Sequence, residues 1–166
     1  MSAEVKATKL PYELGDVNPA NIQQLRTVNA TTLPVKYTDK FYRELIDNYT
    51  AEYMKFCFWN GFVVGAVCAR LEGRDTESCK LYIMTINVLA PYRRKGIASE
   101  LLKFVLNKAK ADPTIQEAYL HVQLGNDEAK NFYLHHGFVE DGIIRDYYKR
   151  IDPPDCYLLK MKLREA

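Results

Sequence analysis

The segment at residues 88–98, Val-Leu-Ala-Pro-Tyr-Arg-Arg-Lys-Gly-Ile-Ala, combines cations and a glycine in a way that suits anion binding. It follows a strand-like run and leads into an amphipathic helical pattern. The first backbone N–H groups of a helix lack partners, and the helix dipole adds positive potential there. Because Gly96 permits close approach to the backbone, the pattern predicts a pyrophosphate site. An ordinary solvated turn with a basic cluster is the alternative, and spacing alone does not decide between them.

Other familiar chemical motifs are missing from the sequence. No Gly-Lys-Ser/Thr follows the turn, so it is not a Walker loop, and the three-glycine dinucleotide pattern is also absent. The cysteines show no CxxC or other metal-ligand spacing, so we expect no metal. None of them lies beside a predicted base or helix start, which disfavours a covalent thiol route. Reduced thiols are typical of a cytoplasmic protein, and a nuclear location is left open.

Length and composition favour one soluble domain. The 166 residues fall within the ~100–200 of a typical domain. A hydrophobic content of 48% allows a packed core, and a net charge of +2 is too small to indicate a nucleic-acid partner. No stretch approaches the ~20 apolar residues of a membrane span. We expect a flexible tail over residues 1–11 and one domain over residues 12–166.

The periodicity of apolar residues predicts an α/β (α+β) domain. Helices are expected from Asn18-Pro19, from Thr38-Asp39, and over residues 96–111 and 127–136. Strands are expected at residues 12–17, 53–59, 62–71, 81–89, 117–124, 138–148 and 156–163. Asn60-Gly61 predicts a tight hairpin. The strand–helix–strand order over residues 81–124 predicts a right-handed crossover and a parallel pair. The result is a mixed, mostly antiparallel seven-stranded sheet with a central parallel pair and four helices on its faces.

Two motifs resemble those of a known superfamily. Arg93-x-x-Gly96-x-Ala98 resembles the acyl-CoA pyrophosphate loop of the GNAT acetyltransferases, with alanine in place of the second glycine. A second segment, at the expected distance from the first motif, resembles the second cofactor segment of that superfamily through Asn126, Ala129, Phe132, Tyr133, Gly137 and Phe138.

Further segments narrow the resemblance. Residues 81–85, 89–94, 119–122 and 147–151 are similar to the NatE (San) type of N-alpha-acetyltransferase, and the likeness runs from about residue 13 to 163. It implies the GNAT fold and direct transfer of acetyl from acetyl-CoA, in a ternary complex, to the α-amine of nascent or free peptide N-termini. An initiator Met followed by an apolar residue would be favoured. It also implies association with the large auxiliary subunit of the NatA complex at the ribosome.

The resemblance assigns catalytic roles to Tyr82, His121 and Tyr133. An α-amine with a pKa of ~8 must lose a proton before it attacks a thioester, and the first two would remove it through ordered water. Tyr82 and His121 also lie mid-strand on the predicted parallel pair, where they flank a single site. Tyr133 would protonate the departing thiolate. Without the resemblance, His121 reads as a structural strand residue and Tyr133 as a core aromatic.

The resemblance also assigns both substrates. It assigns acetyl-CoA binding to Ile86, Asn87, Val88, Arg93, Arg94, Lys95, Gly96, Ile97, Ala98, Ser99, Asn126 and Tyr133. A strand bulge at residues 86–88 would turn backbone N–H groups toward the thioester. The resemblance assigns peptide binding to Leu33, Pro34, Val35, Tyr37, Met84, Tyr147, Tyr148 and Ile151. The family usually has Phe where this chain has Leu33. Helix capping is the alternative for Asn126, and strand propensity for the paired tyrosines.

Two other functions compete. One is a GNAT enzyme that acetylates a lysine side chain or a small amine, although an apolar first loop and the Tyr147-Tyr148 segment favour an extended peptide end. The other is a catalytically silent scaffold subunit of the NatA complex, which retention of the cofactor and catalytic residues disfavours.

Overall fold

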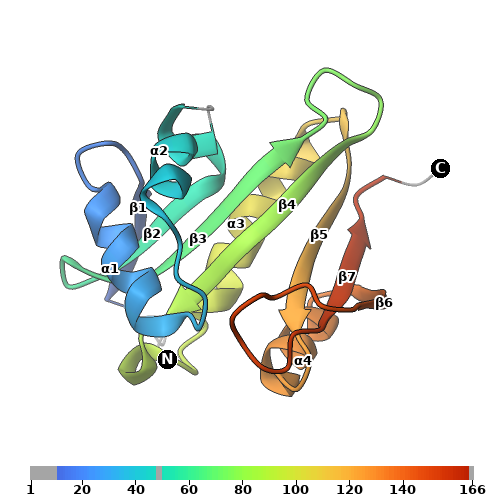
Figure 1. The fold of residues 1–166 in the computed structure, drawn as a ribbon. Helices are drawn as coiled ribbons and strands as arrows, with labels where there is room; N and C mark the ends of the chain where they lie inside the picture. Colours follow the sequence, from blue (N-terminus) through green and yellow to red (C-terminus); the bar gives the residue numbers. More distant parts are fainter. Residues whose placement is uncertain (1–10, 48–49, 165–166) are drawn as a thin grey trace, which may run out of the picture.

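The computed structural model describes residues 11–47 and 50–164, so the tail predicted over residues 1–11 lies, apart from Pro11, outside the described part. One sheet with strand order β1-β2-β3-β4-β5-β7-β6 forms the centre of the fold (Figure 1). Its strands are β1 (Tyr12–Asp16), β2 (Met54–Trp59), β3 (Phe62–Glu72), β4 (Cys79–Val88), β5 (Ile115–Gln123), β6 (Val139–Ile144) and β7 (Cys156–Lys162). Among these described strands only β4 and β5 pair in parallel, which confirms the predicted seven-stranded mixed sheet.

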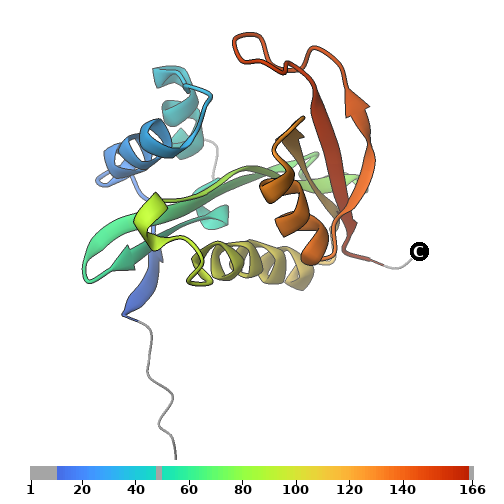
Figure 2. The same cartoon turned by 90° about the horizontal axis from the view of Figure 1, so that it is seen from below.

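Helices cover both faces of this sheet. They are α1 (Ile22–Thr32), α2 (Asp39–Asp47), α3 (Ile97–Ala111) and α4 (Asp127–His135), with short 3₁₀ turns at Thr50–Tyr53 and Ala90–Tyr92. Figure 2 shows α1 and α2 on one side of the sheet and α3 on the other. Tyr133 of α4 belongs to the same buried cluster as α3. In the described part of the chain, no helix is both long and apolar enough to cross a membrane.

Helix α3 forms because its apolar residues recur at helical spacing and face the sheet. Ile97, Leu101, Leu102, Val105, Leu106 and Ala109 are all buried on that side. The helix contacts strands β2 to β5, so it occupies the crossover between the parallel strands. Its first turn therefore stands directly after the end of β4.

The local start signals are partly confirmed. Helix α1 begins at Ile22 and not near Asn18, because the Asn18 side chain caps a preceding turn by accepting from the N–H of Ala20 at 2.9 Å. Thr38 does cap α2, since its Oγ1 accepts from the Phe41 N–H at 3.3 Å. Asn60, the first residue of the predicted hairpin turn, has a left-handed φ of 47°.

Strand β6 ends at Ile144, so the predicted strand over residues 138–148 is too long. Asp155 binds the start of the following loop and keeps it out of the strand. Its carboxylate accepts from the Asp146 N–H at 2.9 Å and pairs with Arg145 at 2.9 Å. Tyr147 and Tyr148 consequently lie in the loop of residues 145–155, and strand propensity does not explain them.

The parallel pair opens after a few residues. Pairing runs from Cys79–Ile115 to Tyr82–Tyr119, and no further partners of β4 and β5 face each other. On its other side, β4 stays paired with β3, but the register shifts so that Met84 is an extra residue. The bulge thus lies at Met84 and not at residues 86–88. Bulges bend the strand that carries them, so β4 and β5 diverge toward the start of α3.

Candidate active site

The point where β4 and β5 part brings three polar rings together. Tyr82 is registered opposite Tyr119, so His121, two residues further along β5, lies on the same face. The Tyr82 hydroxyl lies 3.1 Å from His121 Nδ1 and 3.3 Å from the Tyr147 hydroxyl. His121 and Tyr147 stack with centroids 4.3 Å apart. The structure therefore joins two residues predicted as catalytic with one predicted to bind peptide.

Burial sets the protonation states of the pair. The pKa of Tyr82 is raised, chiefly by burial and then by its hydrogen bond with Tyr147. The pKa of His121 is lowered by burial, and the carboxylate of Glu72 opposes that change. At neutral pH Tyr82 is therefore a neutral phenol and His121 a neutral imidazole. Of the two, the imidazole is the group ready to accept a proton.

A cavity of about 160 Å³ fills the gap between the diverging strands. Its walls include Thr85 and Ile86 of β4, and Leu120 of β5. Tyr133 enters from α4, where it is 9% exposed and burial raises the pKa of its phenol. No described residue is hydrogen-bonded to its hydroxyl. Tyr133 is thus both a core aromatic and a wall of the gap, so the two interpretations from the sequence do not exclude each other.

The basic turn opens onto a second cavity, of about 460 Å³. Gly96 begins α3 with a left-handed φ of 82°, and a Cβ placed on it would meet nothing within 4 Å. Arg93, Arg94 and the first turn of α3 line this cavity. Arg93 Nε donates to the Val88 carbonyl at 3.0 Å, which holds its guanidinium against the turn. The region combines free helix N–H groups, cations and open space, as an anion site requires.

Asn126 lines both of these cavities and also caps α4, accepting from the Ala129 N–H at 3.2 Å. The predicted capping role is confirmed. Its side-chain oxygen is therefore held in place at the junction between the gap and the cofactor side.

Two predicted cofactor residues point elsewhere. The Lys95 ammonium lies 5.6 Å from the centroid of the Trp59 ring, and Lys95 is absent from the described walls of the cavity. The Asn87 amide is buried and donates to Asn29 Oδ1 at 2.7 Å and Thr32 Oγ1 at 2.8 Å. This side chain therefore ties β4 to α1, although the residue borders the cavity.

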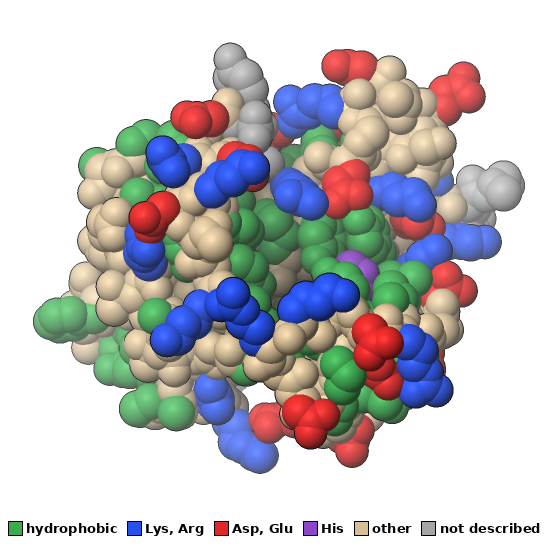
Figure 3. Space-filling model, viewed as in Figure 1, with side chains coloured by type: hydrophobic (Ala, Val, Ile, Leu, Met, Phe, Trp, Pro, Cys, Tyr) green, Lys and Arg blue, Asp and Glu red, His purple; other side chains and the backbone are tan. Residues whose placement is uncertain are grey.

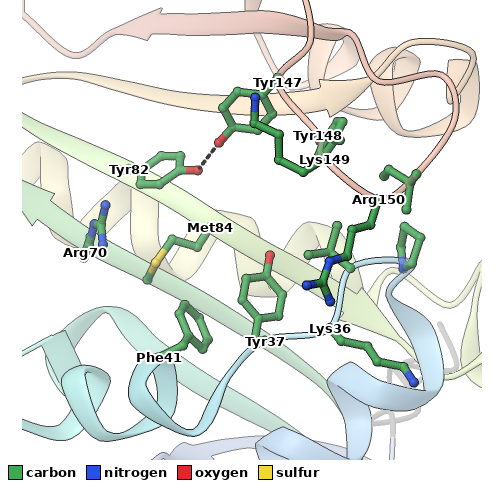
Figure 4. A pocket seen from close by; sticks show the side chains of 13 residues that line it. Lys36, Tyr37, Phe41, Arg70, Tyr82, Met84, Tyr147, Tyr148, Lys149 and Arg150 are labelled. Carbon is green, nitrogen blue, oxygen red and sulfur yellow. Dashed lines mark hydrogen bonds between the residues drawn. The ribbon is translucent and has the colours of Figure 1, made fainter.

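The third cavity, of about 750 Å³, lies on the face of the sheet that carries Tyr82 (Figure 4). Tyr37 stacks on Phe41 with centroids 4.3 Å apart, and burial raises the pKa of Tyr37 to about 12. The other predicted peptide-binding residues on its walls are Pro34, Val35, Met84, Tyr147, Tyr148 and Ile151. Leu33 instead lines the gap and the cofactor-side cavity.

Sequence reasoning missed several residues on these walls. Phe41 lies in the helix expected from Thr38-Asp39, and the sequence assigns no role to it or to Arg70. Arg70 is registered opposite Tyr82, so strand alternation was a usable signal for it. Lys36, Lys149 and Arg150 also line the cavity. Figure 3 shows Lys and Arg side chains at the edge of a hydrophobic hollow on this face.

The three cavities adjoin one another through shared walls, and we call this row of cavities the passage. Pro34 and Tyr148 border both the gap and the tyrosine-lined cavity, while Ile86 and Ala129 border both the gap and the basic turn. An anionic carrier held at one end thus reaches an apolar pocket at the other, beside Tyr82. Within the described residues, no group of His, Cys, Asp or Glu is placed to hold a metal ion. The arrangement suits transfer of a group from the carrier to a nucleophile.

Comparisons with known proteins agree with this geometry. The model of the acetyltransferase (GNAT) family matches residues 22–138. N-alpha-acetyltransferase 50 of Danio rerio is 44% identical over 92% of this chain and 89% of its own. Probable N-acetyltransferase san of Drosophila melanogaster is 41% identical over 96% of this chain and 85% of its own.

A solved structure extends the likeness to three dimensions. Arabidopsis thaliana Naa50 in complex with the bisubstrate analogue CoA-Ac-MVNAL superposes with a TM-score of 0.84 at 39% identity. The alignment covers 91% of this chain and 98% of that one. Fold, family model and relatives agree over most of the sequence, and the chain therefore belongs to the acetyltransferase (GNAT) family, as a member of the NatE type.

Proposed function

We propose that this protein is an acetyl-CoA-dependent N-alpha-acetyltransferase that acetylates protein N-termini. One observation carries the proposal: three adjoining cavities, which share lining residues, lead from the basic turn at Gly96 to the tyrosine-lined cavity, and Tyr82 and His121 border them. The names of the relatives support the same activity.

The residues of the passage fit acetyl-CoA. The open space at Gly96, the first N–H groups of α3, and Arg93 and Arg94 suit its pyrophosphate. The narrow gap beyond Asn126 suits an extended pantetheine arm. When bound, acetyl-CoA supplies an acetyl thioester for attack by the amine. No metal is needed for that chemistry.

Residues of this chain are placed to transfer the protons of the reaction. The Tyr82 hydroxyl lies between the acceptor cavity and His121 Nδ1, so it relays the proton of the α-amine to the imidazole, directly or through water. Because its own pKa is raised by burial, Tyr82 stays protonated between turnovers. Tyr133 also keeps its proton at neutral pH, since burial raises its pKa, and its hydroxyl is available to the departing sulfur.

The acceptor cavity suits an N-terminal Met followed by an apolar residue. Met84, Phe41 and Ile151 offer apolar surface, and the hydroxyls of Tyr37 and Tyr147 are available to the peptide backbone. The Arabidopsis relative was solved with an analogue carrying the peptide MVNAL, which begins in this way. Leu33 lies outside this cavity, so its departure from the family's Phe bears first on the gap.

On the family resemblance alone, we further propose that the protein acts in the cytoplasm or nucleus in association with the NatA complex at the ribosome. Co-purification of the large auxiliary subunit with the tagged chain tests this proposal. Absence of the tagged chain from ribosome-bound fractions would contradict it.

Mass spectrometry of acetylated peptides tests the activity. We expect the purified chain to acetylate the α-amine of a Met-Leu peptide, and not an internal lysine of the same peptide with a blocked N-terminus. Acetylation confined to the lysine would favour the lysine enzyme. Acetyl-CoA binding without transfer to any peptide would favour the silent scaffold.

A further inference from the structure

A carboxylate stands behind the Tyr82–His121 pair, on the side away from the peptide cavity. Glu72, at the end of β3, accepts a hydrogen bond from the Tyr119 hydroxyl at 2.6 Å. The Tyr119 ring stacks on Tyr82 with centroids 4.8 Å apart and meets His121 edge-on at 5.9 Å. A single hydrogen bond therefore fixes a ring that touches both members of the pair.

Arg70 contacts both Glu72 and the Tyr82 ring. Its Nη2 lies 3.2 Å from Glu72 Oε1, and its guanidinium lies 5.3 Å from the centroid of the Tyr82 ring. The two oxygens of Glu72 are thus engaged by different partners, Arg70 on one and Tyr119 on the other. A carboxylate held at both oxygens has a defined direction, unlike an ordinary surface glutamate.

We propose that Glu72, acting through Tyr119, is a positioning residue that orients His121 and Tyr82 and places a negative charge beside the imidazole during transfer. Neither residue borders the described walls of the acceptor cavity. Their effect is therefore on the catalytic pair and not on peptide contact. This inference rests on the proposed function for its kinetic consequence, whereas its electrostatic consequence is measurable without any acceptor.

The other charged groups on this side of His121 are paired, as Glu72 is with Arg70. A cavity of about 430 Å³ on this side is lined by both His121 and Tyr119. Lys80 pairs with Glu117 at 2.9 Å, and Lys160 pairs with Asp141 at 2.9 Å. The titratable and charged groups that contact the imidazole or line this cavity with it are Tyr82 and Lys80 from β4, Glu117 and Tyr119 from β5, Glu72 from β3, Lys160 from β7 and Tyr147 from the loop of residues 145–155.

The direction of the electrostatic effect follows from the two opposing influences on His121. Burial lowers the pKa of the imidazole, and the negative charge of Glu72 raises it. Without the negative charge of Glu72, the effect of burial is less opposed, so the pKa of His121 falls below its value in the parent protein. A weaker base accepts the amine proton less readily.

An NMR titration of the histidine rings tests this. The chain has 3 histidines, so His135 and His136 serve as internal references. We expect Glu72→Gln to lower the midpoint of the His121 resonance and to leave the other two unchanged. Glu77→Gln is the matched control, because it removes the same charge from an exposed position in the β3–β4 loop. An unchanged His121 midpoint in Glu72→Gln would overturn the electrostatic part of the proposal.

Kinetics test the positioning. Hydrogen bonds to charged groups are worth about 10- to 100-fold in an equilibrium, so we expect kcat to fall by at least about tenfold in Glu72→Gln and in Tyr119→Phe, with the KM for acetyl-CoA unchanged. The double variant should be no slower than the slower single variant, since both act along one path. Multiplied losses, or a kcat equal to that of Glu77→Gln, would overturn the proposal.

The acetyltransferase activity and the role of Glu72 are refuted by different results. If the parent protein acetylates no α-amine, the proposed function fails, while the titration still decides whether Glu72 sets the charge state of His121. If Glu72→Gln does not fold, Tyr119→Phe keeps the ring and removes only the hydroxyl. An undiminished kcat in that variant would be sufficient to reject the positioning role.

Discussion

Two glycines with nearly identical φ angles allow a controlled test of the cofactor turn. Gly96 has φ +82° and Gly61, in the β2–β3 hairpin, has φ +83°. A Cβ added at either position meets nothing within 4 Å. Alanine at each site therefore costs only the left-handed backbone strain, about 1–2 kcal/mol. For a chain of this size that corresponds to a drop in Tm of roughly 2–8 °C, and we expect it to be alike in the two variants.

Binding of coenzyme A should separate them. The open space at Gly96 lies in the cavity beside the first N–H groups of α3, where a methyl group would stand in the path of a phosphate. Loss of one such hydrogen bond to a charged group costs about 1.5–3 kcal/mol. Each 1.4 kcal/mol is about tenfold in affinity. Gly96→Ala is therefore expected to weaken binding about 10- to 100-fold, and Gly61→Ala not at all.

Isothermal calorimetry with coenzyme A measures the affinity, and thermal melts without ligand measure the shared strain. S-acetylpantetheine, which has no pyrophosphate, provides a second readout, because its rate of use should be the same in both variants. Equal affinities for coenzyme A in Gly96→Ala and Gly61→Ala would refute the assignment of the turn. A loss that extends to S-acetylpantetheine would show that the substitution acts through general distortion.

Three shorter predictions test other parts of the site. Tyr82→Phe removes the hydroxyl that contacts His121, so kcat should fall about 100-fold while the calorimetric affinity for acetyl-CoA stays unchanged. Lys95→Gln should bind coenzyme A like the parent because its ammonium faces Trp59, whereas Arg94→Gln should bind it more weakly, as the same titration will show. Asn87→Ala removes two hydrogen bonds to α1, one of them buried, and should lower the free energy of unfolding by about 1–3 kcal/mol, measured by urea denaturation.

The parts of the fold that sequence predicts are those governed by local periodicity. The apolar stripe of α3 and the Asn60-Gly61 turn each follow from neighbouring residues, and the structure confirms both. The pairing of Tyr82 with His121 follows from alternation once the parallel strands are accepted. These features need no knowledge of how distant segments pack.

The features that sequence does not predict depend on distant contacts. The extra residue at Met84 is visible only in the register between β3 and β4. Asp155 draws Tyr147 out of a strand through hydrogen bonds across the loop. The hydrogen bond from Tyr119 to Glu72 spans 47 residues of sequence. Tyr119 belongs to the family-like segment at residues 119–122, but Glu72 belongs to no such segment, so the sequence left the contact between them unstated.

The location of the site follows from the single parallel pair. A parallel connection requires a crossover helix, so α3 must begin where β4 ends, and its positive N-terminus lies at that edge. Continued pairing of β4 with β5 would close the sheet between this edge and Tyr82 with backbone hydrogen bonds. The bulge at Met84 coincides with the loss of that pairing, and the passage opens where the pairing ends. Helix dipole, gap and acid–base pair are therefore consequences of one topological feature, which explains why residues distant from each other in the chain act at one point.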